Sequence, residues 1–133
     1  MGEGDGEASL CGLARGALAL VARARPDAWA EMTRALDGLT LRATLDGDMT
    51  LRSAHGQLRE VTAPAVASIR VSCDRAAARD LVYGHATLLA AIRAGRVEVA
   101  GDVAALQRGL HAFEVFVGAL LRLDEAEALR RAL

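Results

Sequence analysis

The sequence predicts a single α+β domain in which helices cover one face of a mostly antiparallel sheet of about five strands. Three observations support this prediction. Residues 39–52 and 65–73 alternate apolar and polar side chains, as half-buried strands do. Residues 10–24 repeat apolar side chains every three or four positions, as amphipathic helices do. Residues 74–121 then combine helical patterns with one short strand, separated by glycines.

The beginning of the chain separates into a tail and two helices. Residues 1–9 hold three glycines and three acids, so we expect a flexible tail, with one domain over residues 10–133. Pro26 ends the first helix, because proline disfavours helical geometry in the residue before it. The same proline can begin a second short helix, which Gly38 ends.

A hairpin and a third strand follow. Asp46-Gly47 is a strong turn signal between the alternating segments Leu39–Leu45 and Met49–Arg52. After a polar loop, Ala65–Cys73 forms another alternating segment. In all three segments one face is apolar and the other is polar and carries arginines. We therefore expect a sheet with one wet face and one face covered by helices.

The second half of the chain supplies that cover. Two short amphipathic segments end at Gly84 and Gly95, and a strand over residues 96–99 follows at once. Asp102 then opens the longest helix, whose apolar side chains recur at helical spacing through Leu120. Residues 124–133 form a short terminal helix with acids early and arginines late, which suits the helix dipole.

The composition indicates an interior of small aliphatic side chains. Hydrophobic residues make up 53% of the chain but aromatic residues only 3%. Small side chains leave gaps between helices and sheets more readily than aromatic ones, so a hollow core is possible. The net charge is −1, and every basic residue is an arginine. This balance argues against nucleic acid as a partner and allows at most transient membrane contact.

The cysteines and the apolar runs point to the cytoplasm. Cys11 and Cys73 are too few for a disulfide framework and are predicted to be buried free thiols. No run approaches the roughly 18 apolar residues needed to span a bilayer. Acidic residues precede the apolar stretch that begins at Leu10, the opposite of a secretory signal.

Side chains capable of chemistry are scattered. His55, His85 and His111 accompany no Gly-x-Ser-x-Gly motif, so surface or capping roles are favoured. The cysteines and histidines lack the close pairs of a zinc site. Asp46 and Asp48 flank a turn glycine and suit a hairpin better than a calcium site. We therefore predict no catalytic residue, no metal and no cofactor.

The region after the third strand resembles the sterol carrier protein type 2 domain family. Asp74 opens a helix, Gly84 ends it, and the run AIRAGRVEVAGD over Ala91–Asp102 leads into apolar residues through Leu110. The resemblance extends over about residues 39–121. It implies a sheet covered by helices, with an apolar tunnel between the two layers that takes lipids.

The function implied is the non-catalytic binding and carriage of a lipid or another hydrophobic small molecule, such as a fatty acyl, sterol-like or polyketide-like compound. Residues 54–65 are shorter than the corresponding connection in the family, which leaves the tunnel mouth and the ligand size open. The facing of the patterns and the positions in the family suggest the lining residues: Leu41, Met49, Ile69, Val71, Leu88, Ile92, Leu106, Leu110, Phe113 and Phe116.

Three alternatives stay open at this point. The apolar stripe of residues 103–120 suits plain core packing as well as a tunnel wall. A hydrophobic pocket can also serve a cyclase-like or isomerase-like enzyme, with His111 or Glu114 transferring protons. Finally, the helix over residues 10–24 could pack against a second copy, so the chain could be a monomer, a homodimer or an oligomerisation module.

Overall fold

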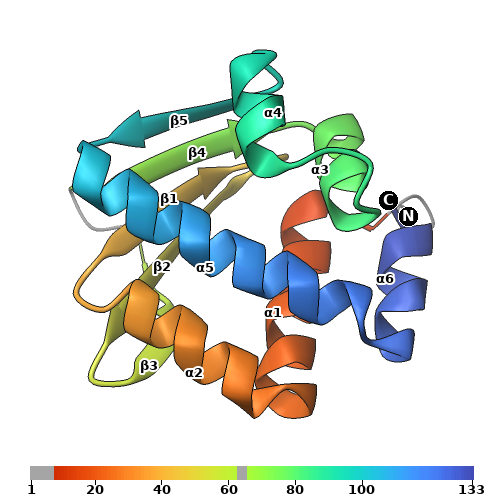
Figure 1. Cartoon of the computed structure of the whole chain (residues 1–133), viewed down its shortest axis with the longest axis horizontal. Helices are drawn as coiled ribbons and strands as arrows, with labels where there is room; N and C mark the ends of the chain where they lie inside the picture. Colours follow the sequence, from red (N-terminus) through yellow and green to blue (C-terminus); the bar gives the residue numbers. More distant parts are fainter. Residues whose placement is uncertain (1–7, 63–65) are drawn as a thin grey trace.

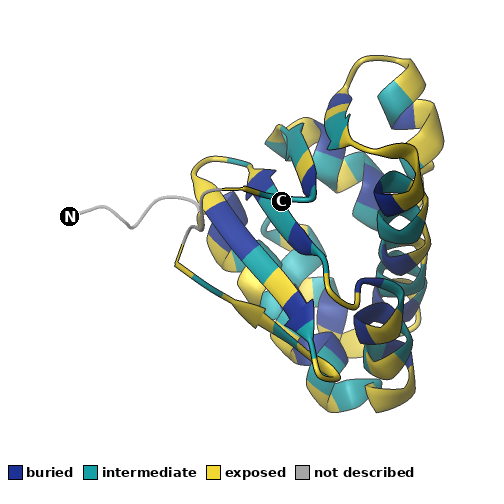
Figure 2. Ribbon diagram, turned by 90° about the vertical axis from the view of Figure 1, so that its left-hand side faces the viewer, coloured by how far each residue is buried: buried dark blue, intermediate teal, exposed yellow. Residues whose placement is uncertain are grey.

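The computed structural model describes residues 8–62 and 66–133; most of the predicted tail lies outside them. A five-stranded sheet has helices on one face, and among these described residues the other face carries no helix (Figures 1 and 2). This arrangement confirms the predicted α+β fold with its mostly antiparallel sheet. The helices are α1 (Leu10–Ala24), α2 (Pro26–Ala35), α3 (Arg75–Val82), α4 (Leu88–Arg93), α5 (Val103–Leu121) and α6 (Glu127–Arg131), with a 3-10 turn, η1 (Asp124–Ala126), before α6.

The sheet has the order β3-β2-β1-β4-β5. All neighbouring strands are antiparallel except β1 and β4, which run parallel. Leu41 lies opposite both Leu51 and Ile69, so these apolar side chains form a row on one face. The strands are β1 (Thr40–Thr44), β2 (Asp48–Ala54), β3 (Gln57–Glu60), β4 (Ile69–Cys73) and β5 (Val97–Gly101).

The helix layer packs onto that apolar face around two separate clusters. One cluster joins α1, α2 and α5 through residues that include Val21, Met32 and Leu120. The other joins α3, α4 and β5 and includes Leu81 and Val97. Helix α5 runs along the whole helix layer and contributes to both sides (Figure 1). The interior is therefore divided, and the space between the clusters is bounded by α5 and the sheet.

The structure corrects two predictions about the strands. The loop expected after β2 contains β3, a short edge strand that the alternation did not reveal because Leu58 is its only apolar residue. Of the strand predicted over residues 65–73, residue 65 lies outside the described residues, residues 66–68 are not in a strand, and the strand begins at Ile69. Its partner β1 starts only at Thr40, after the turn at Gly38. The positions opposite Val66 and Ala67 therefore precede β1, and these two residues have no strand residue to pair with.

The predicted helix starts are confirmed. The carboxylates of Asp74 and Asp102 accept hydrogen bonds from the N–H groups of Ala77 and Ala105, as N-caps do. Gly101, the last residue of β5, has φ +151°, and a Cβ at this position would lie 2.6 Å from the carbonyl oxygen of Ser68. Only glycine fits there. Within the described residues, no helix combines the length and apolarity that crossing a bilayer requires.

A candidate binding cavity

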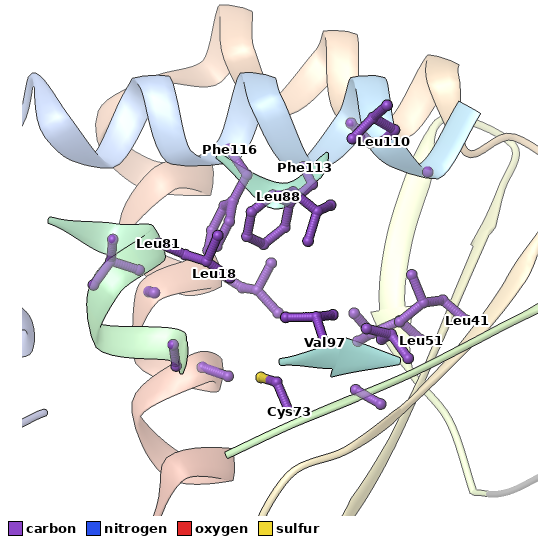
Figure 3. A pocket seen from close by; sticks show the side chains of 18 of the residues that line it. Leu18, Leu41, Leu51, Cys73, Leu81, Leu88, Val97, Leu110, Phe113 and Phe116 are labelled. Carbon is purple, nitrogen blue, oxygen red and sulfur yellow. The ribbon is translucent and has the colours of Figure 1, made fainter. Parts of the chain in front are cut away.

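A cavity of about 500 Å³ lies between the helix layer and the sheet. Sites for small molecules typically measure roughly 300–1,000 Å³, so the volume is that of a ligand site. All five strands contribute side chains to one wall, β3 through Leu58 alone, and the helices supply the opposite wall (Figure 3). The cavity occupies the space between the two core clusters, where small and aliphatic side chains do not meet.

All ten residues predicted from the sequence lie on the wall of this cavity. Leu41, Met49, Ile69 and Val71 come from the sheet, and the other six come from α4 and α5. Phe113 and Phe116, whose ring centroids are 6.3 Å apart, project from α5 into the space below it (Figure 3). The structure thus brings the whole predicted set together.

Sequence reasoning missed the contribution of both ends of the chain. Leu10, Leu13 and Leu18 of α1 line the cavity, as do Leu129 and Leu133 near the carboxyl end. The apolar stripe of α1 was the available signal, but periodicity does not say which surface a helix faces. The terminal residues gave no such signal, because α6 has only 5 residues, too few for apolar side chains to repeat at helical spacing.

The lining is almost entirely apolar. Among the lining residues, only Gln107 carries a side-chain amide and only Arg130 carries a charge. Arg130 donates hydrogen bonds to the carbonyl oxygen of Leu120 at 3.1 Å and to the carboxylate of Glu127 at 2.9 Å. The hydrogen bond from Arg130 lowers the pKa of Glu127. The cavity wall therefore has one neutral polar group and one charge that already has its counter-ion.

The two thiols differ in their surroundings. Cys11 is buried, and its Sγ contacts the carbonyl oxygen of Gly47 at 3.4 Å. Cys73, predicted to be buried, is only partly so, because it faces the cavity at the end of β4. Loss of water around the thiol, and then the charge of Asp74, raise the pKa of Cys73. Cys73 is thus a protonated thiol at neutral pH, adjoining the cavity.

Three exposed lining residues show where the cavity opens. Leu89 of α4 is 44% exposed, Val103 at the start of α5 is 71% exposed, and Gln107 lies one turn further along α5 and is also exposed. The rest of the lining is buried or half-buried. The cavity therefore reaches solvent on the side of the molecule that α4 and the first turns of α5 form.

The candidate proton-transfer residues lie elsewhere. His111 and Glu114 are exposed and are absent from the cavity lining. The Nε2 atom of His111 is 2.9 Å from the carboxylate of Glu31 on α2. His55 sits in the β2–β3 turn with φ +55°, and His85 lies 3.9 Å from Asp80. None of the three histidines contributes to the cavity wall.

No protein-family model matches the sequence, and no curated protein sequence matches it.

Comparison by structure finds sterol carrier protein 2 domains. The sterol carrier protein domain 2 of Helicoverpa armigera superposes with a TM-score of 0.61 at 9% identity, over 88% of this chain and 94% of that one. The UbiJ-SCP2 ubiquinone synthesis protein gives 0.57 at 22% identity, over 80% and 88%. A structure of sterol carrier protein 2 gives 0.56 at 19% identity, over 91% and 99%. The chain has the sterol carrier protein 2 fold, as its sequence motifs suggested.

Proposed function

We propose that this protein binds a lipid or another hydrophobic small molecule in the cavity between its sheet and its helices and carries it without chemical change. The observation that carries the proposal is the near absence of polar groups from a cavity of ligand size. A space of this kind does not hold water well and accepts apolar guests. The fold shared with sterol carrier proteins supports the same proposal.

The driving force is the removal of apolar surface from water. A guest that buries about 300 Å² of apolar surface gains roughly 7–8 kcal/mol before the entropy cost of association is subtracted. Few directional contacts are needed for binding of that strength. The proposed contacts are the ten lining residues predicted from the sequence. The two free thiols are consistent with a protein that acts in a reducing cytoplasm.

The alternatives receive less support. An enzyme that folds a reactive chain in the cavity needs a proton-transfer group there, and His111 and Glu114 lie outside the lining. A dimer through α1 would use its apolar stripe, but Leu10, Leu13 and Leu20 already face the cavity or the core of the same molecule.

The test is a titration of delipidated protein with N-phenyl-1-naphthylamine, a neutral dye that fluoresces in apolar surroundings. We expect saturable fluorescence that palmitic acid, cholesterol or a polyketide-like compound displaces. Native mass spectrometry of freshly purified protein should show a co-purifying hydrophobic mass. If no dye and no member of the panel binds saturably, the proposed carriage is wrong.

A matched pair of variants ties binding to the cavity. Val71→Phe places a ring where the cavity wall now has a small side chain, and Val66→Phe places the same ring on a 79% exposed residue. The first variant should weaken dye binding at least tenfold, and the second should leave it within twofold of the wild type.

A further inference from the structure

A second cavity, of about 290 Å³, lies between α2 and α5, which pack side by side (Figure 1). None of the residues that line it also lines the large cavity. Its volume is close to the lower end of the range for small-molecule sites, roughly 300–1,000 Å³. The second cavity therefore has the size of a site for a small molecule, and it is independent of the proposed carriage.

The floor of this cavity is made of small residues. Ala28 of α2 and Ala119 of α5 are buried there, and Gly118 lies beside them. A Cβ at Gly118 would meet no atom within 4 Å, so the packing does not require glycine at this position. Glycine in a helix interior is less favourable than alanine. The missing side chain leaves open space in the middle of the cavity.

Opposite charges stand on either side of that space along α5. Glu114, Gly118 and Arg122 follow one another at intervals of four residues and so lie on one face of the helix. The acid and the base are two turns apart, about 12 Å along the helix, whereas such side chains pair at one turn. In the described part of the chain neither side chain has an ion pair or a hydrogen bond. Both charges are thus available to a ligand.

Helix α2 adds to this polarity. Glu31 belongs to the acidic end, because its carboxylate is 2.9 Å from Nε2 of His111, one turn before Glu114. At the other end Arg25 and Asp27 form an ion pair of 3.2 Å and cancel each other's charge. The cavity therefore has two carboxylates at one end and, at the other, the free guanidinium of α5.

We propose that this cavity binds a linear zwitterion, an aliphatic molecule with an ammonium group at one end and a carboxylate at the other. The ammonium group lies between Glu31 and Glu114, and the hydrocarbon linker crosses the open space at Gly118. The carboxylate accepts hydrogen bonds from Arg122, whose guanidinium can donate two in parallel. Exposed ion pairs are individually weak, so binding requires both ends and the linker together.

The first experiment compares three small probes by nuclear magnetic resonance titration of the whole chain. The probe ε-aminocaproate has both charges, caproate has only the carboxylate, and hexylamine has only the ammonium group. We expect ε-aminocaproate to shift the backbone amide signals around Gly118 with a Kd on the order of 1 mM. Each singly charged probe should bind about fivefold more weakly, because it loses one ion pair. Added sodium chloride should weaken binding of the zwitterion, because salt screens exposed charges.

Two charge variants assign the ends of the ligand. Arg122→Gln should weaken ε-aminocaproate about fivefold and leave hexylamine within about twofold, since hexylamine has no carboxylate. Glu114→Gln should weaken ε-aminocaproate by a similar factor and leave caproate within about twofold. Both side chains are exposed, so neither substitution should unfold the protein.

A matched pair of leucine variants tests the open space. Gly118→Leu fills the middle of the cavity, and Ala104→Leu places the same side chain on an exposed residue of α5 that lines neither cavity. The first should weaken ε-aminocaproate at least about tenfold, and the second should leave it within about twofold. Leucine favours helices more than glycine does, so thermal unfolding should show no loss of stability in Gly118→Leu.

Several results would overturn the zwitterion site. These are the absence of a saturable shift, equal affinity for all three probes, unchanged binding in Gly118→Leu, or shifts confined to residues of the large cavity. Should Gly118→Leu not fold, the two charge variants decide the matter by themselves. Binding of N-phenyl-1-naphthylamine to the large cavity should be unchanged by ε-aminocaproate, so failure of this proposal and failure of the carriage are separate observations.

Discussion

The carboxylate of Asp46, in the β1–β2 turn, accepts a hydrogen bond of 3.1 Å from the backbone N–H of Cys11 at the start of α1. The same carboxylate also accepts from the N–H of Leu10. An acid from a distant turn therefore satisfies N–H groups that have no partner within the helix, alongside the local cap from Ser9. This contact joins the hairpin to the helix that forms one side of the cavity.

Removing that carboxylate should destabilise the fold. Asp46→Asn keeps the shape of the side chain but loses the charge that favours the positive end of α1. We expect the midpoint of thermal unfolding to fall by a few degrees at pH 7. Glu125→Gln, an exposed acid of η1, serves as the control and should unfold within one degree or so of the wild type.

The effect of Asp46→Asn should depend on pH. The N–H groups of Leu10 and Cys11 lower the pKa of Asp46 below its ordinary value of 3.8. A carboxyl with a lowered pKa in the folded state stabilises the fold above the ordinary value, and this contribution disappears as the pH falls through the lowered one. The difference between wild type and variant should therefore be constant from pH 5 to 7 and shrink below about pH 4. A difference that grows in acid would contradict this role.

Glycine at position 101 should be indispensable. A Cβ there would lie 2.6 Å from the backbone oxygen of Ser68, and its φ of +151° is unfavourable for other residues. We expect Gly101→Ala to lower the free energy of unfolding by about 2 kcal/mol or more, measured by urea denaturation. Unchanged stability would show that β4 and β5 can separate at this point at little cost.

Gly118 should behave in the opposite way. It lies inside α5, and a Cβ there meets no atom within 4 Å. Glycine in a helix interior costs roughly 1 kcal/mol relative to alanine, so Gly118→Ala should raise the free energy of unfolding by about 0.5–1 kcal/mol. Together with Gly101→Ala, it separates the effect of the backbone conformation from the effect of glycine removal as such.

The thiol beside the cavity should report on occupancy. The pKa of Cys73 is raised above 9.0, so only the small thiolate fraction reacts with iodoacetamide at neutral pH. In Cys11→Ser protein, the rate of alkylation should rise about tenfold per pH unit between pH 7 and 9. A bound guest should slow the reaction at every pH, measured by mass spectrometry. Equal rates with and without saturating guest would show that the guest does not cover Cys73.

The sequence was sufficient for the larger features of the fold because these depend on strong local patterns. Asp74 and Asp102 stand where helices begin, and Asp46-Gly47 stands where two strands reverse, so the elements could be located. Strand β3 was not predicted, because its residues, Gln57–Glu60, neither alternate clearly between apolar and polar nor become buried. Its position depends on pairing with β2, which is information that lies outside the strand.

The candidate site was predicted in its centre and missed at its edges. Side chains such as Ile69 and Phe113 lie on the apolar faces of well-marked elements, so facing alone placed them on the wall. Leu133 and Gln107 line the cavity because of how α6 and the start of α5 meet the other elements. No periodicity expresses such a relationship, since it depends on the angles between helices.

The unfilled space has a consequence for the lifetime of the protein in a cell. Atoms that border a void lack the van der Waals partners that a solid interior would provide, so the empty form resists unfolding less than a compact domain of the same length would. Any compound that occupies the void lowers the fraction of unfolded chain in proportion to its concentration. Proteases that act on unfolded chains would thus remove idle copies first, and the supply of cargo would set how much of the protein persists.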